Sequence, residues 1–303
     1  MEILQFLQKI RLPVLNEFML LITEFGGEIA FLVTAIVIFW CFDKRQGYFI
    51  MSVGFAGTII SQFMKLWFRI PRPWIKEPGI AMEAAVGDAG GYSFPSGHSQ
   101  SFVGTFGSVA LTTRNKIIRA VCIAIAVLVP FSRMYVGVHT PLDVGVGSLI
   151  ALVLMFAVRP LVYSQKKCMM PILIGVLTLL TAAHLAFVFL YEFPADVDAY
   201  NLLHGRENAC TMAGCITGMI LVYIVDENWL HFSTKAVWWA QIIKVAVGLG
   251  LILAVKSGMK GILNGMFGDY AGRAVRYFLI VLVAGVLWPM TFRYFEKLGK
   301  KEQ

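Results

Sequence analysis

Long apolar segments recur along the whole chain and alternate with short polar stretches. Segments of about 20 apolar residues are long enough to cross a bilayer as helices. The pattern predicts helices at residues 3–24, 28–42, 47–68, 96–112, 117–131, 141–159, 170–191, 211–225, 236–255 and 274–295. We therefore expect an all-α polytopic membrane helical bundle, with a six-helix core followed by about four C-terminal transmembrane helices. The first segment is partly amphipathic, so it either spans the membrane or lies in its interface.

The composition agrees with a membrane protein. Of 303 residues, 58% are hydrophobic and 15% are charged, whereas soluble domains carry about 25% charged residues. The net charge of +8 raises nucleic acid as a partner, but the basic residues lie mostly between apolar segments, where membrane topology explains them. Residues 1–11 are amphipathic and do not resemble a cleavable signal peptide. The five cysteines show no metal-ligand spacing, so we expect them to pack as small apolar residues.

The connections between apolar segments fall into two sets that differ in charge. One set is short and strongly basic, as at Lys44-Arg45, Arg114 to Lys116 and Lys166-Lys167. Short basic loops face the cytoplasm in most membrane proteins. The other set, which includes loops 192–208 and 256–273, should therefore lie on the extracytoplasmic side. This alternation predicts about ten membrane helices, or nine if the first does not span, with both ends of the chain inside.

Residues suited to phosphate chemistry gather in the second set of loops. Thr140-Pro141 is a helix-start signal, because a capping hydroxyl precedes a proline that suits the first helical position. His139 then lies just outside a helix N-terminus, and Asp143 lies in its first turn. A carboxylate that accepts the Nδ1 proton leaves Nε2 of the imidazole as an outward lone pair. Such a histidine, near Arg133 and a helix N-terminus, suits attack on a phosphoryl group.

Two further stretches lie upstream of this segment. One runs from Lys65 to Arg72-Pro73, and the other is Pro95-Ser96-Gly97-His98 at the start of an apolar segment. Together with the segment Ser132 to Asp143, they resemble the three motifs of the type 2 phosphatidic acid phosphatase and vanadium haloperoxidase superfamily, in order and in internal spacing. The resemblance covers roughly residues 1–163. It implies a membrane phosphatase catalytic core at 1–163 and leaves 164–303 as C-terminal transmembrane helices of unknown role.

The resemblance also implies a role for each matched residue. His139 would be the nucleophile that forms a phosphohistidine, Asp143 would orient it, and His98 would protonate the leaving oxygen. The phosphate-binding residues would be Lys65, Arg72, Ser96, Gly97 and Arg133. The role of Ser132 stays open. We expect no metal and no other cofactor, because the cations and helix-start amides already supply a positive field and the motifs lack a metal-ligand set.

These features predict an enzyme, a phosphoric monoester hydrolase or diphosphatase that acts on a phosphorylated lipid held in the bilayer. Undecaprenyl diphosphate is the first choice, with the protein in a bacterial plasma membrane and the active site on the extracytoplasmic side. No nucleic acid partner is expected, and the oligomeric state is left open.

Several alternatives remain at this point. A lipid-linked phosphotransferase would share the phosphohistidine, and phosphatases of other lipid or sugar phosphates share the motifs. A haloperoxidase has a similar site, but its substrates are aqueous, which disagrees with a membrane core. A lipid transporter or scramblase would carry its ionisable residues along a midplane route, whereas here they gather at one membrane face. The C-terminal helices are either a lid or head-group selector or, more simply, an accessory bundle or dimer surface.

Overall fold

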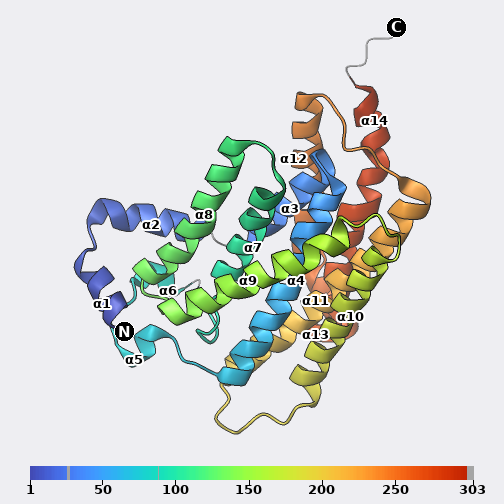
Figure 1. Ribbon diagram of the computed structural model, residues 1–303. Coiled ribbons are helices and arrows are strands. Elements are labelled where there is room, and N and C mark those ends of the chain that lie inside the picture. Colours follow the sequence, from blue (N-terminus) through green and yellow to red (C-terminus); the bar gives the residue numbers. More distant parts are fainter. Residues whose placement is uncertain (26–27, 88, 299–303) are drawn as a thin grey trace. The chain divides into compact units, whose positions relative to one another are not determined.

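The computed structural model describes residues 1–25, 28–87 and 89–298, and within these ranges it contains helices and turns but no strand. The helices, labelled in Figure 1, are α1 (Glu2–Lys9), α2 (Pro13–Phe25), α3 (Glu28–Cys41), α4 (Lys44–Phe68), α5 (Pro73–Lys76), α6 (Glu83–Val86), α7 (Gly97–Thr112), α8 (Lys116–Tyr135), α9 (Pro141–Val162), α10 (Met169–Leu190), α11 (Ala199–Val225), α12 (Trp238–Gly258), α13 (Lys260–Leu282) and α14 (Phe292–Lys297). Two π-helical turns follow α11 and α13, at Asp226–Leu230 and Val283–Leu287.

Among the described residues, seven helical stretches are long and apolar enough to cross a membrane. They are Lys44–Lys76, Lys116–Tyr135, Pro141–Val162, Met169–Leu190, Ala199–Leu230, Trp238–Gly258 and Lys260–Lys297. The last four confirm the prediction of about four C-terminal transmembrane helices, and the all-α membrane bundle is confirmed as well. Helices α2, α3 and α7 are shorter, at 13, 14 and 16 residues, so the predicted count of nine or ten spans includes helices below the usual spanning length.

The first predicted helix is in fact two helices, α1 and α2. Pro13 lacks a backbone N–H and begins the second of them. Arg11, in the break, donates from Nε and Nη2 to the carbonyl of Tyr135 and from Nη2 to that of Ile80. The break therefore ties the N-terminal segment to the end of α8 and to the loop before α6.

The two outer loops predicted after residue 191 are shorter than expected. Helix α11 begins at Ala199 and α13 begins at Lys260, inside the predicted loops 192–208 and 256–273. Their first turns mix polar and apolar residues, so the apolar pattern did not reveal them as helix. Within α13, Gly268 has a φ of +76°, which interrupts the helix at a position that favours glycine.

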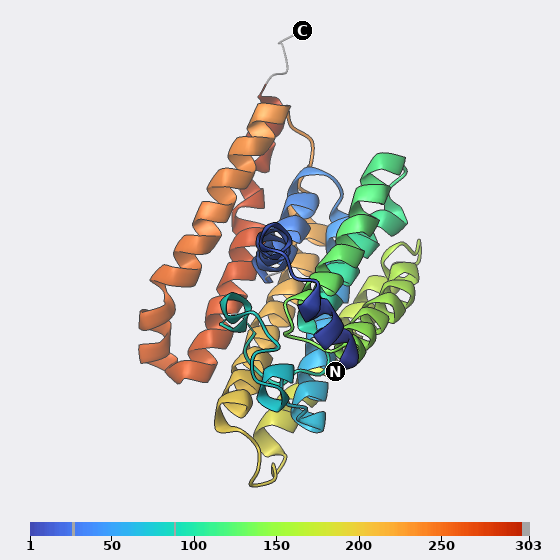
Figure 2. The ribbon, with the colours of Figure 1, turned by 90° about the vertical axis from the view of Figure 1, so that its left-hand side faces the viewer.

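The chain forms two compact units, and each unit consists of three separate segments of the sequence. One contains residues 1–34, 49–163 and 192–205, and the other contains 35–48, 164–191 and 206–303. In the first unit, α7 packs along both α8 and α9, and α2, seen nearly end on in Figure 2, packs against α8. The division into a catalytic core at 1–163 and C-terminal helices at 164–303 remains a prediction.

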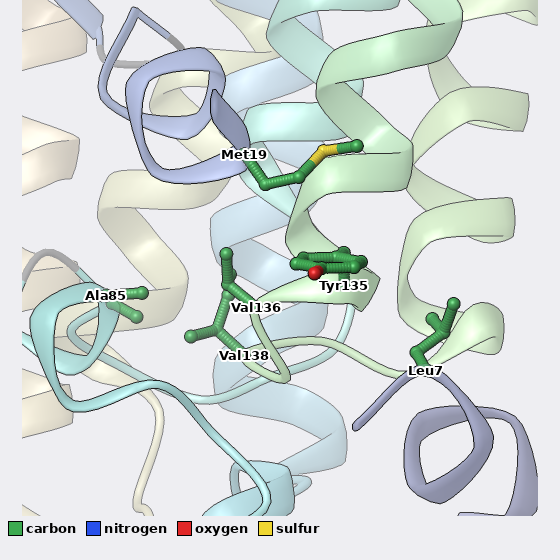
Figure 3. Close-up of a cluster of buried hydrophobic side chains, with 7 residues drawn as sticks. Leu7, Met19, Ala85, Tyr135, Val136 and Val138 are labelled. Atoms are coloured by element: carbon green, nitrogen blue, oxygen red, sulfur yellow. The ribbon is translucent and has the colours of Figure 1, made fainter. Parts of the chain in front are cut away.

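A buried apolar cluster in the first unit holds the segment that follows α8. It contains Leu7 of α1, Met19 of α2, Ala85 of α6, Ala89, Tyr135, Val136 and Val138, and all of these except Ala89 are labelled in Figure 3. The Tyr135 hydroxyl donates to Oδ1 of Asn16 at 2.8 Å. Because Val136 and Val138 are fully buried, the backbone just before residue 139 is fixed from several directions.

The second unit is held by polar contacts as well as apolar packing. Lys44 forms an ion pair with Asp226 at 2.7 Å, and the fully buried Lys244 donates from Nζ to the carbonyl of Trp40 at 2.9 Å. A Cβ on Gly214 of α11 would lie 2.2 Å from the carbonyl oxygen of Ala274, so glycine lets α11 and α13 approach closely.

Candidate active site

His139 is buried, with 1% of its surface exposed, and its backbone is set by the end of α8. The carbonyl of Arg133 accepts hydrogen bonds from the amides of Val138 and His139 at 3.1 and 3.3 Å. The turn between them needs glycine at 137, because its φ is +83° and a Cβ there would lie 2.3 Å from the Ile80 carbonyl oxygen. The tight turn therefore fixes the backbone of His139 at the start of α9.

The predicted helix start at Thr140-Pro141 is confirmed. The Thr140 hydroxyl accepts from the Asp143 amide at 3.3 Å, and Asp143 Oδ2 accepts from the Thr140 amide at 2.7 Å, which is a capping box. The same Oδ2 lies 3.6 Å from His139 Nδ1. This distance is just beyond a direct hydrogen bond, so the carboxylate is near the imidazole but is engaged first with the helix start.

Ser93 lies beside both of these groups, and sequence analysis did not identify it. Its hydroxyl donates to Asp143 Oδ2 at 2.6 Å and lies 3.5 Å from His139 Nδ1. The side chain is fully buried, and its amide donates to the Ile70 carbonyl at 2.8 Å. The only sequence signal was its place two residues before Pro95.

Arg72 contacts the imidazole at its other ring nitrogen, Nε2. Its Nη1 lies 2.8 Å from His139 Nε2. Its other donors reach the carbonyls of Gly91 (from Nε, 2.9 Å), Val138 (from Nη1, 3.2 Å) and Gly90 (from Nη2, 2.6 Å), and the residue is only 4% exposed. Because a guanidinium has no acceptor, Nε2 must be the unprotonated nitrogen, and the imidazole proton must sit on Nδ1. This is the tautomer that nucleophilic attack from Nε2 requires.

The predicted phosphate-binding residues Ser96 and Gly97 form the start of α7. Ser96 is its N-cap, and Ser96 Oγ accepts from the amide of Ser99 at 3.4 Å and from its hydroxyl at 2.9 Å. Ser96 is fully buried, and its amide donates to the Asp143 carbonyl at 3.0 Å, which joins α7 to α9. A Cβ on Gly97 would meet nothing within 4 Å, so space is open at the start of this helix, where an anion is favoured.

The remaining predicted residues surround His139. Burial lowers the pKa of His139 well below its usual range, and the positive charges of Arg72, Arg133 and Lys65, together with His98, lower it further. These groups act on His139 because the folded chain brings all of them around it. The imidazole is therefore neutral, as a nucleophile must be.

The three groups Lys65, Arg133 and His98 each lie at the end of a different helix. Lys65 lies in the last turn of α4, Arg133 in the last turn of α8, and His98 in the first turn of α7. Arg133 is almost fully buried and donates from Nη1 to the Thr23 hydroxyl of α2 at 2.6 Å. Ser132 donates to the Val129 carbonyl at 2.7 Å, so its hydroxyl serves the helix.

The site thus combines a neutral imidazole, three cationic side chains, open helix-start space and a second histidine, all suited to phosphoryl transfer. Within the part of the chain that the structure describes, no three His, Cys, Asp or Glu residues gather as a metal-ligand group.

Comparisons with known proteins agree with this chemistry. The family model described as "PAP2 superfamily" matches residues 45–167, and "PAP2 superfamily phosphatase, transmembrane extension" matches residues 210–301. The chain is 31% identical over 164 residues to phosphatidylglycerophosphatase B of Bacillus subtilis (50% of this chain, 76% of the relative). It is 30% identical over 151 residues to an undecaprenyl-diphosphatase of Sulfolobus acidocaldarius (49% and 71%).

A crystal structure of a transmembrane PAP2-type phosphatidylglycerolphosphate phosphatase from Bacillus subtilis is also similar. It has 28% sequence identity and a TM-score of 0.46, and the match covers 55% of this chain and 85% of that one.

Proposed function

The chain belongs to the PAP2 superfamily, and on that basis we propose that it is an integral membrane phosphatase of lipid phosphates or diphosphates that forms a phosphohistidine at His139. The observation that carries this proposal is the 2.8 Å contact between Arg72 Nη1 and His139 Nε2. A phosphate that accepts from Arg72 Nη1 in place of His139 lies directly in front of the unprotonated nitrogen. Arginine suits this task, because its fork of N–H groups matches phosphate oxygens.

The reaction proceeds in two displacements. His139 Nε2 attacks phosphorus and the bond to the leaving oxygen breaks. Burial and the charges of Arg133, Lys65 and Arg72 lower the pKa of His98, so His98 takes up a proton once the anionic substrate offsets these cations, and it donates that proton to the leaving oxygen. The phosphorylated imidazole carries a positive charge, which Asp143 stabilises through Ser93 and Nδ1. Water, assisted by His98, then attacks phosphorus and restores His139, and inorganic phosphate leaves.

Fixed positive charges stabilise the transferring group. Arg72 and Arg133 are held by hydrogen bonds to the protein, and Lys65 supplies a third cation. The amides at Gly97 and His98 add helix-start donors. Such preorganised donors neutralise the equatorial phosphate oxygens without a divalent ion, so we propose a metal-independent enzyme.

The substrate we propose is a lipid whose tail stays in the bilayer while its phosphate reaches the site, with undecaprenyl diphosphate as the first choice. Relatives named as undecaprenyl-diphosphatases and as phosphatidylglycerophosphatase B support this class. The basic loops favour an active site on the extracytoplasmic side of a bacterial plasma membrane.

A substrate panel tests the proposal. Purified protein in detergent is offered a prenyl diphosphate, the matching prenyl monophosphate, phosphatidylglycerophosphate and phosphatidic acid, and released phosphate is measured. Parallel samples contain a chelator or orthovanadate. We expect release that survives chelation and is inhibited by vanadate, a mimic of five-coordinate phosphorus. No release from any lipid would contradict the phosphatase, and activity restored only by a divalent ion would contradict the metal-free mechanism.

A further inference from the structure

The first turn of α11 belongs to the same compact unit as the catalytic motifs. Residues 192–205 group with this unit, although the rest of α11 does not. Asp198 starts the helix, because its Oδ1 accepts from the Asn201 amide at 2.8 Å, and its own amide donates to the Tyr92 hydroxyl at 3.1 Å. A Cβ on Gly205 would lie 2.6 Å from Cδ1 of the buried Leu66, so this turn packs closely on the end of α4.

This turn lies against the two glycines that hold Arg72. The carbonyls of Gly90 and Gly91 accept from the Arg72 guanidinium. The Tyr200 hydroxyl lies 3.4 Å from the position of a Cβ on Gly90, and Asn201 Oδ1 lies 3.6 Å from that of a Cβ on Gly91.

Lys65 reaches the same place from α4. Its Nζ lies 4.0 Å from the position of a Cβ on Gly91, so the ammonium group and the Asn201 amide oxygen both lie near the same side of this glycine. Tyr200 is 63% exposed, and its ring stacks on that of His204 at a centroid distance of 6.3 Å. The turn therefore presents a hydroxyl and an amide beside a cation, at the edge of the phosphate site.

We propose that Tyr200 and Asn201 form a specificity subsite with Lys65 for a second phosphate, next to the one that is transferred. Neutral hydrogen-bonding groups beside an ammonium suit the oxygens of an additional anionic group. Lys65 is then shared by the two phosphates, whereas Arg72 and Arg133 act on His139 and serve the transferred phosphate alone. The inference rests on the proposed function and narrows it, since such a subsite favours diphosphate lipids over monophosphates. The family-model matches end at 167 and resume at 210, so the subsite comes from a segment outside both.

An isosteric charge change tests the subsite. Asn201→Asp keeps the side-chain shape but places a negative charge where the second phosphate would bind. The matched control is Asn228→Asp, which adds the same charge at an exposed position beyond the other end of α11. We measure kcat/KM for a prenyl diphosphate and for the prenyl monophosphate of equal length, and inhibition by methylenediphosphonate relative to orthophosphate.

The proposal predicts a selective effect. Asn201→Asp should lower the ratio of kcat/KM for the diphosphate to kcat/KM for the monophosphate about tenfold or more, because like charges repel at short range. It should also weaken inhibition by methylenediphosphonate relative to inhibition by orthophosphate. Tyr200→Phe, which removes only the hydroxyl, should lower the same ratios by a smaller factor and serves if Asn201→Asp does not fold. Ratios within twofold of the wild type, including an equal loss on both substrates, would overturn the subsite. Wild-type protein that hydrolyses neither lipid would overturn the proposed function, and the subsite with it.

Discussion

Arg72 Nη1 lies 2.8 Å from His139 Nε2, so the nitrogen that we propose as the nucleophile rests against a guanidinium that we propose as a phosphate ligand. This contact fixes the imidazole tautomer, and in the proposed mechanism it also marks the place of the transferred group. Because Arg72 also donates to three backbone carbonyls, its position does not depend on substrate.

Replacing Arg72 by lysine should keep a positive charge but lose the fork of donors. We expect Arg72→Lys to lower kcat/KM by about a hundredfold or more, because arginine and lysine are not equivalent at a bidentate site. Steady-state kinetics with the best lipid substrate checks this. Arg69→Gln is the control, since the Arg69 side chain donates to the carbonyls of Leu66 and Trp67 at the end of α4, and it should remain close to the wild type. Equal kinetics for Arg72→Lys and the wild type would remove the guanidinium from the mechanism.

Ser93 should behave as a positioning residue between Asp143 and His139. Ser93→Ala removes the 2.6 Å hydrogen bond to Asp143 Oδ2, and we expect kcat to fall by about 10- to 100-fold with little change in KM. If both residues act through one contact, the double variant Ser93→Ala/Asp143→Asn should be no slower than Asp143→Asn alone. If the loss of kcat in the double variant equalled the product of the two single losses, Ser93 would act independently of Asp143.

The neutral state of buried His139 has a consequence for stability. Its pKa lies below the usual value of about 6.5, so below that pH the unfolded chain binds a proton that the folded chain does not. The folded state should therefore lose stability through this group as pH falls below about 6.5, and should lose none through it above. His139→Asn cannot take up this proton. Between pH 7 and pH 5, its Tm in detergent should fall less than that of the wild type.

The control for this pH dependence of Tm is His231→Asn, which changes a histidine at an exposed position. Its Tm should fall with pH much as the wild type does. If Tm fell equally with pH in the wild type and in His139→Asn, His139 would take up its proton in the folded protein as readily as in the unfolded chain.

The orientation of the site can be read by chemical labelling. In a background with the exposed Cys168 replaced by serine, Ala84→Cys places a thiol at an exposed position of α6. An impermeant maleimide should label it in intact cells, whereas Lys116→Cys, at a basic loop, should react only after permeabilisation. The reverse pattern would place the active site in the cytoplasm.

Much of this fold and site could be predicted from sequence because the signals were local. Apolar length gave the four C-terminal spans, and Thr140-Pro141 marked the start of α9. The break before Pro13 and the early start of α11 were missed, because an amphipathic segment looks continuous and a polar first turn looks like a loop.

The contacts within the site were less predictable. The helix start and the resemblance both pointed to Asp143 as the partner of His139, but they did not reveal Ser93, whose hydroxyl reaches both groups only when the loop before α7 folds onto α9. Likewise, spacing identified Arg72 but could not show that its guanidinium meets Nε2. Such contacts join segments far apart in sequence, and no local pattern encodes them.

The most direct test of the account is to trap the phosphorylated enzyme. Protein is mixed with a lipid substrate labelled in its terminal phosphate, quenched in alkali, where phosphohistidine is stable, and mapped by mass spectrometry. We predict phosphate on His139, with His139→Ala showing neither label nor turnover, and His98→Ala turning over more slowly because both protonation of the leaving oxygen and water attack are impaired. Phosphate release by His139→Ala at a rate close to that of the wild type, or label on another residue, would contradict a histidine nucleophile at this position.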